Sequence, residues 1–259
     1  MNRVGAETIG TMKKSIVIVV VMMAAVVCAA QEITVAAASD LNFALKEIAQ
    51  KFEAKTGTKV KLTFGSSGNF FTAIQNGAPY DVFFSADMDY PKQLEASGLT
   101  ELGTLYEYAV GRLVIWTPAD SPVDVTQGSA VLMDPRVRKI AIANPQHAPY
   151  GRAAVAMMTA AGVYERVKGK LVLGENISQT AQFVQTGNAD VGLIALSLAI
   201  SPTMRGKYWI VPTKAHAAIR QATVVLKSSP QKAAARAFLE YVKSDESRAI
   251  LTKYGFDKP

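Results

Sequence analysis

Short apolar runs alternate with helical patterns along this chain, and the alternation restricts its fold more than any other feature. Residues 33–37 form a mostly apolar run and residues 59–64 alternate apolar with polar side chains, so both are predicted strands. Between them, residues 41–57 repeat apolar side chains at the spacing of one helix face and end in glycine. A helix over 69–75 and a strand over 80–85 follow. This order predicts an α/β fold with parallel strands and right-handed crossovers.

The same order of elements continues over the second half of the chain. No stretch rich in Pro and Gly divides the sequence, so two lobes, if present, must share strands as hinges. The strands predicted over 108–116 and 222–226 are the candidates for these crossings. The other predicted strands cover 139–143, 171–173 and 191–196, and the other predicted helices cover 150–161, 178–186 and 232–244.

Residues 1–30 have the pattern of an export signal. Lys13 and Lys14 precede an unbroken apolar run of 15 residues, which is shorter than the about 20 residues that a membrane-spanning helix needs. The run ends in small residues, so we predict cleavage after Ala30, with Met12 as an alternative start of the chain. The sequence therefore predicts a periplasmic protein.

The predicted mature chain has few groups suited to metal or redox chemistry. The whole sequence contains one Cys and two His, and Cys28 leaves with the signal, which excludes a thiolate-rich metal site. The signal holds three basic residues and one acidic residue, a net of +2, so the total of +7 becomes +5. The basic residues are dispersed, and the densest group (Arg136, Arg138 and Lys139) has no interleaved aromatic residues. We therefore do not expect nucleic-acid binding.

The junctions between predicted strands and helices are the best candidates for a binding site. Ligands of parallel α/β folds bind at the carboxyl ends of strands, beside the N-termini of the following helices. Ser39 and Ser67 lie at two such junctions, where a hydroxyl can cap the helix or face an anion together with free backbone N–H groups. No junction contains Lys or Arg, so an anion site there would use neutral donors. The five junctions are 36–40, 64–69, 83–87, 144–151 and 174–178.

A periplasmic serine hydrolase is an alternative from another class. His147 could act as the base for Ser39 or Ser67, with Asp40 or Asp87 orienting its ring. The sequence lacks the G-x-S-x-G pattern of a nucleophile elbow, the P-loop pattern and the dinucleotide-binding fingerprint. Anion binding is the favoured hypothesis from these residues, and hydrolysis stays open.

Six stretches at and near these junctions carry a resemblance: 33–41 (ITVAAASDL), 64–68 (FGSSG), 77–87 (GAPYDVFFSAD), 148–152 (APYGR), 174–177 (GENI) and 254–256 (YGF). At these stretches the sequence resembles the periplasmic molybdate-binding proteins of ABC transporters. The resemblance covers essentially all of residues 32–257. It implies a type II periplasmic-binding-protein fold, an α/β fold with mainly parallel sheets, in which crossing hinge strands join lobe I (31–108 plus 222–259) to lobe II (109–221).

The resemblance also implies which residues hold the oxyanion. Ser39 and Ser67 match the serine pair of the family's first lobe, and the backbone donors of its second lobe fall on Tyr150 and Ile177. A tyrosine hydroxyl that the family uses falls on Ala195 here, so that donor is missing. The hydroxyl of Tyr150 is a candidate replacement.

Asp40, next to Ser39, fits a site for a dianion poorly. A carboxylate that faced the anion would repel it, so we expect Asp40 to point away, toward solvent or toward the N-terminus of its own helix. An inward Asp40 would instead favour phosphate, because a protonated oxyanion needs an acceptor in its site.

The function implied by the resemblance is capture and delivery without catalysis. Molybdate or tungstate would be held between the lobes and passed to an ABC permease, by a monomer that has no cofactor, binds no nucleic acid and does not enter the membrane. The same fold binding sulfate, phosphate or thiosulfate remains an alternative.

Overall fold

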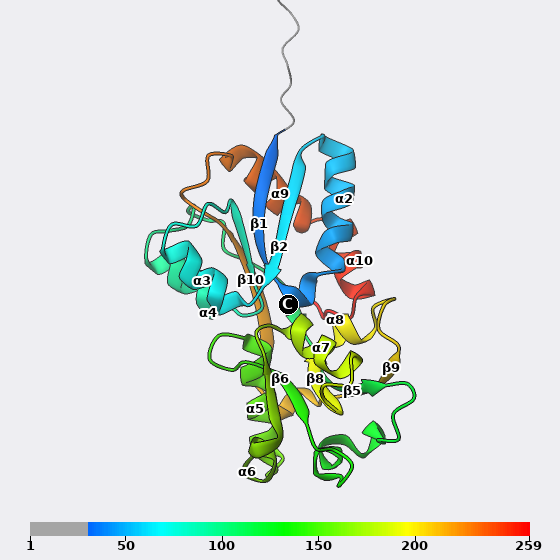
Figure 1. The fold of residues 1–259 in the computed structure, drawn as a ribbon. Coiled ribbons are helices and arrows are strands. Elements are labelled where there is room, and N and C mark those ends of the chain that lie inside the picture. Colours follow the sequence, from blue (N-terminus) through cyan, green and yellow to red (C-terminus); the bar gives the residue numbers. More distant parts are fainter. Residues whose placement is uncertain (1–30) are drawn as a thin grey trace, which may run out of the picture.

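The computed structural model describes residues 31–259, which form two α/β lobes arranged end to end (Figure 1). Each lobe is built on one five-stranded sheet with helices packed against it, which confirms the predicted α/β class. The predicted export signal lies outside the described residues. Within residues 31–259, no helix combines the length and the apolar character needed to cross a membrane.

The sheet of the first lobe has the strand order β2-β1-β3-β10-β4. β1 pairs in parallel with β2 and β3, as the alternation of strands and helices predicts. β10 returns from the second lobe and pairs antiparallel with both β3 and β4. The strands are β1 (Glu32–Ala38), β2 (Lys59–Gly65), β3 (Val82–Ser85), β4 (Tyr106–Gly111) and β10 (Ile219–Val225).

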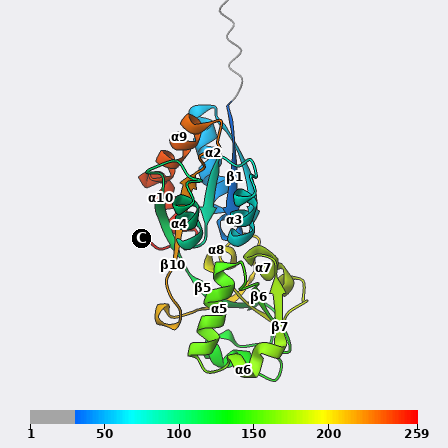
Figure 2. The same ribbon diagram turned by 90° about the vertical axis from the view of Figure 1, so that its left-hand side faces the viewer.

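Helices cover both faces of this first sheet (Figure 2). α2, α9 and α10 form one core with the sheet, in which the rings of Phe52 and Phe238 lie 5.1 Å apart. On the opposite face, α3 and α4 bury Phe70 and Leu94. α2 ends where the sequence predicts, because Gly57 adopts the left-handed conformation (φ 73°) that glycine favours. The helices are α2 (Ala44–Thr56), α3 (Ser67–Gln75), α4 (Asp89–Ala96), α9 (Lys232–Val242) and α10 (Asp245–Lys253).

The second lobe repeats this plan with the strand order β7-β6-β8-β5-β9. β6 is parallel to β7 and β8, whereas β5 is antiparallel to β8 and β9. The strands are β5 (Leu113–Pro118), β6 (Ile140–Ala143), β7 (Leu171–Gly174), β8 (Val191–Ala195) and β9 (Gly206–Ile210). The helices are α5 (Pro149–Ala160), α6 (Tyr164–Val167), α7 (Ile177–Gln185) and α8 (Leu196–Ala199), and the short 3₁₀ segments of the molecule are η2 (Ser39–Leu41), η3 (Val125–Met133), η4 (Lys168–Lys170) and η5 (Thr213–Ala215).

The chain crosses between the lobes twice. The prediction of one long strand over 108–116 is wrong, because Arg112 separates β4 from β5 and these strands belong to different sheets. Crowding explains the glycine just before this crossing: a Cβ atom on Gly111 would lie 2.2 Å from the hydroxyl oxygen of Tyr150. The return crossing covers 211–218, between β9 and β10.

Candidate functional site

A small cavity lies where the two lobes meet. The chain segments after β1, β2 and β3 face those after β6 and β7, so carboxyl ends of strands from both sheets surround one space. Its volume is about 10 Å³, close to the roughly 10–15 Å³ that one water molecule needs, whereas pockets for drug-sized ligands have about 300–1,000 Å³. The cavity therefore suits a ligand of a few atoms. It is lined by Ala38, Ser39, Asp40, Gly65, Ser66, Ser67, Ala86, Ala148, Pro149, Tyr150, Asn176 and Ile177.

Ser39 touches the second lobe directly. It follows β1, and its hydroxyl donates to Asn176 Oδ1 (3.2 Å) and accepts from the Ser178 N–H (3.3 Å). The Ser178 hydroxyl donates in turn to the Ser39 carbonyl (3.0 Å). Asn176 caps α7, since its Oδ1 also accepts from the Gln179 N–H (3.0 Å). The first lobe is thus docked on the N-terminus of α7.

Ser67 begins α3 and is almost completely buried. Its hydroxyl oxygen accepts from the N–H of Ala86, which follows β3, at 2.9 Å. No hydrogen bond that Ser67 Oγ donates is found within residues 31–259, so its single proton remains for a ligand. The bond to Ala86 fixes the direction in which that proton can be offered.

Tyr150 and Ile177 lie in the first turns of α5 and α7. N–H groups in a first turn have no acceptor inside their own helix, and the helix dipole makes this end partly positive. Pro149 begins α5, where its missing N–H costs nothing. Both helices therefore point free backbone donors at the cavity, which is the arrangement that binds anions. Ala195 is buried at the end of β8 and has no hydroxyl to add.

Asp40 does not point toward solvent, which corrects one of the two orientations expected from the sequence. Its residue is 1% exposed and lines the cavity, with Oδ2 accepting from Gln221 Nε2 at 2.6 Å. Burial raises the pKa of Asp40 from 3.8 to about 6, although the hydrogen bond from Gln221 and the nearby Tyr150 hydroxyl and backbone N–H groups of its own 3₁₀ turn oppose that rise. No hydrogen bond to the Asp40 carboxyl from the N–H groups of this turn is found within residues 31–259, so the second expected orientation, toward its own helix N-terminus, stays a prediction.

The hydroxyl of Tyr150 belongs to the same buried network. Gln221 Nε2 also donates to it (3.2 Å), and Gln221 Oε1 accepts from the Tyr108 hydroxyl (2.7 Å). Burial and the neighbouring Asp40 charge raise the pKa of both tyrosines, so both hydroxyls keep their protons at neutral pH. Gln221 on β10 thereby ties the crossing strands to α5.

Charged and titratable side chains surround the mouth of the cavity, and we call Asn69, Asp87, His147, Arg152 and Glu175 the rim. Arg152 Nη2 of the second lobe contacts Asp87 Oδ2 of the first at 2.5 Å. Burial raises the pKa of Asp87, while the Tyr90 N–H and the positive charge of Arg152 oppose the rise. The Arg152 side chain is 41% exposed, so water and salt screen this pair.

His147 forms the other side of the rim and contacts Ser66, not Ser39 or Ser67. Ser66 Oγ lies 2.8 Å from both the carbonyl oxygen and Nδ1 of His147. One arrangement satisfies both contacts: the hydroxyl donates to the carbonyl and Nδ1–H donates to the hydroxyl. Glu175 Oε2 is 3.8 Å from Nε2 and also binds Asn69 through its other oxygen. Because the Ser66 proton is directed to a carbonyl, this geometry does not prepare a nucleophile.

Four residues at this junction were not among the predicted binding residues: Ser66, Asn176, Ser178 and Gln221. Ser66, Asn176 and Ser178 are adjacent in the sequence to predicted residues. Their contacts are made with the facing lobe, and the sequence does not predict how that lobe is positioned. Gln221 is the exception, because a polar residue at the edge of an apolar strand is a visible signal of a buried contact.

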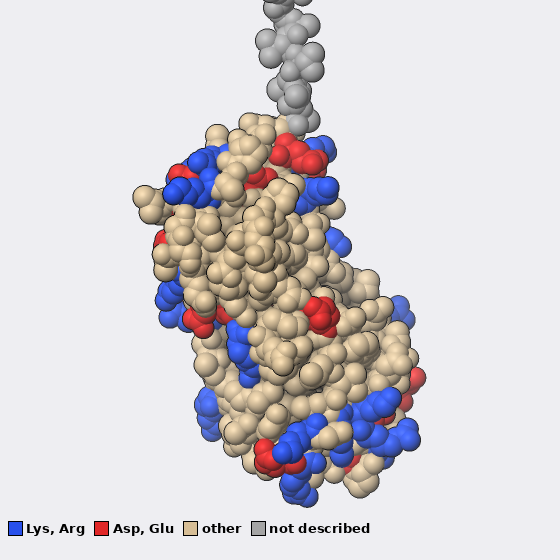
Figure 3. Space-filling view, turned by 60° about the vertical axis from the view of Figure 1, so that its left-hand side comes forward, with Lys and Arg blue, Asp and Glu red and all other residues tan. Residues whose placement is uncertain are grey.

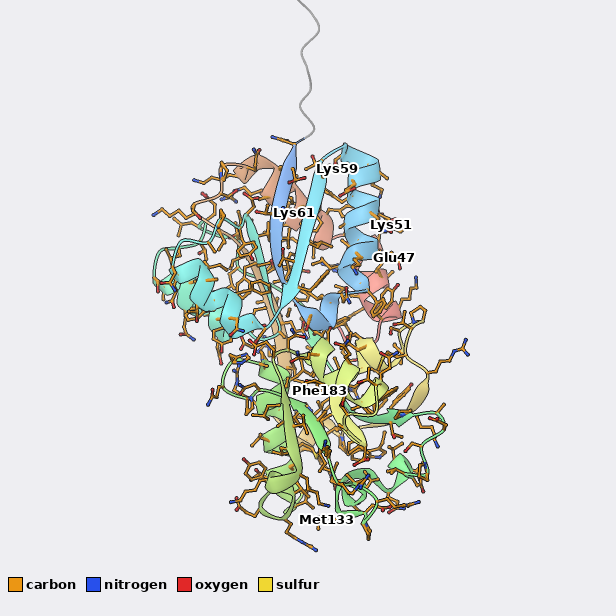
Figure 4. The ribbon with its side chains drawn as sticks, in the orientation of Figure 1. Glu47, Lys51, Lys59, Lys61, Met133 and Phe183 are labelled. Atoms are coloured by element: carbon orange, nitrogen blue, oxygen red, sulfur yellow. The ribbon has the colours of Figure 1, made fainter. Side chains whose placement is uncertain are left out.

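The remaining charges offer no second anion site at the cavity. Lys51, Lys59 and Lys61 lie on α2 and β2, in the part of the first lobe away from the junction (Figure 4). On the face in Figure 3, basic and acidic residues are mixed, and much of the surface beside the junction is uncharged. Within residues 31–259, no three His, Cys, Asp or Glu side chains gather as they would to hold a metal ion. The larger hollow beside α10 lacks converging helix N-termini.

Comparison with known proteins gives one consistent result. Residues 33–257 match the family model of the bacterial extracellular solute-binding proteins. The chain is 41% identical to the molybdate-binding protein ModA of Rhodobacter capsulatus over 87% of this chain and 88% of that protein, and 41% identical to ModA of Azotobacter vinelandii over 87% and 89%. The solved periplasmic molybdate-binding protein of Azotobacter vinelandii superposes with a TM-score of 0.83, at 34% identity, over 88% of this chain and 99% of that one. The predicted periplasmic-binding-protein fold is confirmed.

Proposed function

Because the chain belongs to the family of bacterial extracellular solute-binding proteins, we propose that it binds molybdate between its lobes and delivers it to an ABC permease. The observation that carries this proposal is the cavity, where serine hydroxyls and the first turns of two helices converge from both lobes without a basic residue. Relatives that are named for molybdate binding and are 41% identical over most of the chain support the choice of ligand.

In this proposal the anion replaces its water shell with neutral donors. Ser67 contributes its free hydroxyl proton, and Tyr150 and Ile177 contribute backbone N–H groups. Ser39 contributes its hydroxyl when this turns from Asn176 Oδ1 to the anion. A hydrogen bond to a charged group contributes about 1.5–3 kcal/mol net, so four such bonds supply about 6–12 kcal/mol against the cost of association. The Tyr150 hydroxyl serves chiefly in the network with Gln221, since that is where its contacts lie.

Closure of the lobes follows from the position of the donors. A ligand that touches both lobes binds the closed state better than the open one, and this difference in affinity shifts the population toward closure. The closed surface is then what the permease recognises, and the protein performs no catalysis. Tungstate, which has the same shape and charge, would bind in the same way.

Two other hypotheses make different predictions. Sulfate, phosphate or thiosulfate could occupy a cavity of this kind, and the buried Asp40 is the one observation that favours a protonated anion such as phosphate. A serine hydrolase would need His147 beside Ser39 or Ser67, and His147 contacts Ser66 instead.

Titration calorimetry of the purified, processed protein tests the proposal. We expect molybdate and tungstate to bind far more tightly than sulfate, phosphate or thiosulfate. Failure of every oxyanion to bind more tightly than about 1 mM, which corresponds to about −4 kcal/mol, would contradict the proposal. Tighter binding of phosphate than of molybdate would support the alternative ligand.

A further inference from the structure

We propose that the oxyanion binds together with one proton, which Asp40 takes up in the wall of the cavity. This inference rests on the proposed function and adds a pH dependence to it. In the step, a proton from solvent joins the Asp40 carboxylate as the dianion enters, so the cavity gains one negative charge instead of two. No covalent bond other than the new O–H is formed.

The first support is an oxygen atom without a partner. Asp40 is 1% exposed, and its Oδ2 is occupied by Gln221 Nε2 at 2.6 Å. Its Oδ1 is buried and accepts no hydrogen bond from residues 31–259. A buried, charged oxygen that lacks a donor is costly, and a proton placed on it removes the charge. Oδ1 is therefore the atom on which we place the proton.

The second support is the surroundings of Asp40, which contain no positive charge. The titratable groups that face it are the hydroxyls of Tyr150 on α5 and Tyr108 on β4, and both stay neutral. Gln221 on β10 and Ser197 on α8, whose hydroxyl donates to the Asp40 carbonyl at 2.7 Å, are not charged. Within residues 31–259, no Lys, Arg or His pairs with this carboxylate. Nothing but a proton is available to neutralise it.

The third support is the charge of the ligand. The Asp40 carboxyl, with a pKa of about 6 in the unliganded protein, is largely ionised at pH 7–8. Asp40 follows Ser39 directly and lines the same cavity, so a bound dianion lies close to the carboxylate. Repulsion between like charges raises the pKa of the carboxyl further in the complex. Binding above pH 6 must therefore take up a proton, by the linkage between protonation and binding.

Calorimetry with molybdate between pH 6.5 and 8.5, in pairs of buffers with different ionisation enthalpies, tests the inference. We expect uptake of close to one proton per molybdate at pH 8, and a dissociation constant that rises by up to about tenfold per pH unit. In Asp40→Asn the uptake should disappear, the affinity should become independent of pH, and binding at pH 8 should be about 10- to 100-fold tighter than in the wild type.

Asp87→Asn is the matched control, because Asp87 is also an aspartate whose pKa burial raises, but it lies on the rim. We expect this variant to keep the proton uptake of the wild type. Molybdate binding without proton uptake, or uptake lost in Asp87→Asn instead of Asp40→Asn, overturns the inference and leaves the proposed function intact. If neither the wild type nor Asp40→Asn binds molybdate at any pH, the proposed function fails and the inference with it. If Asp40→Asn misfolds, proton uptake by the wild type still decides.

Discussion

The cavity and its rim join the same two lobes by opposite means. The cavity holds buried groups that hydrogen-bond across the junction, such as Ser39 with Asn176 and Gln221 with Tyr150. The rim joins the lobes through more exposed charged groups, such as Arg152 with Asp87. Losing one partner of a buried polar pair costs about 1–3 kcal/mol or more, whereas an exposed ion pair contributes about 0–1 kcal/mol. The cavity should therefore determine affinity and stability, and the rim should adjust them only slightly.

The largest effect is expected from the pH dependence of stability at Asp40. Its pKa is about 6 in the folded protein and 3.8 as an isolated group, so the folded state binds the proton more strongly. The contribution of Asp40 to the free energy of unfolding is complete below pH 3.8. It is lost as the pH rises through about 6, and the total loss is about 3 kcal/mol. At pH 8, Asp40→Asn should therefore be more stable than the wild type by up to about 3 kcal/mol in chemical denaturation. Parallel pH profiles for the two proteins would contradict this expectation.

The next largest effect is expected from the adjacent serines Ser66 and Ser67. Ser67→Ala removes a donor to the anion and leaves the Ala86 N–H without its acceptor, so molybdate affinity should fall by about 10- to 100-fold. Ser66→Ala is the matched control, since its hydroxyl is occupied by His147, and it should cost less than about fivefold. Equal losses in the two variants would show that the free hydroxyl proton of Ser67 does not determine the affinity.

A smaller effect is expected from Tyr150→Phe. The change removes the hydroxyl that accepts from Gln221 Nε2, so stability should fall by about 1 kcal/mol, measured by thermal unfolding. Molybdate affinity should change by less than about fivefold, because the backbone N–H remains. A loss above tenfold would instead make the hydroxyl a direct donor to the anion, in place of the one missing at Ala195.

The smallest effects are expected on the rim. Arg152→Ala should weaken molybdate binding by less than about fivefold at low salt, and the difference should shrink as salt is added. His147→Ala should bind molybdate nearly as tightly as the wild type. A loss of hydrolytic turnover in His147→Ala would revive the serine-hydrolase alternative.

The sequence predicts the fold better than it predicts the junction. Strands such as β1 and β2 are recognisable because their burial follows the pattern of apolar side chains. β9 escaped prediction because it is an edge strand with four of its five residues exposed. The break at Arg112 could not be seen either, since apolar residues flank it on both sides and only the pairing with two different sheets reveals it.

The serines of the cavity were also recognisable, because Ser39 and Ser67 follow predicted strands. The environment of Asp40 was not, because Gln221, Tyr108 and Tyr150 lie far from it in the sequence and meet it only in the folded chain. Polar contacts of this kind depend on the exact placement of both lobes. Periodicity in one segment carries no information about them.

The position of β10 has a consequence for how the molecule assembles. β10 lies between β3 and β4 in the first sheet and pairs Ala222 with Ser85. In the sequence, the whole second lobe lies between these two residues. As the chain is synthesised from its N-terminus, the first lobe begins early but lacks an inner strand until residue 225 has appeared. The second sheet, contained within 113–210, has all its strands sooner. Since contacts distant in sequence form slowly, the lobe that starts first should finish folding last, with an unfilled gap in its sheet until then.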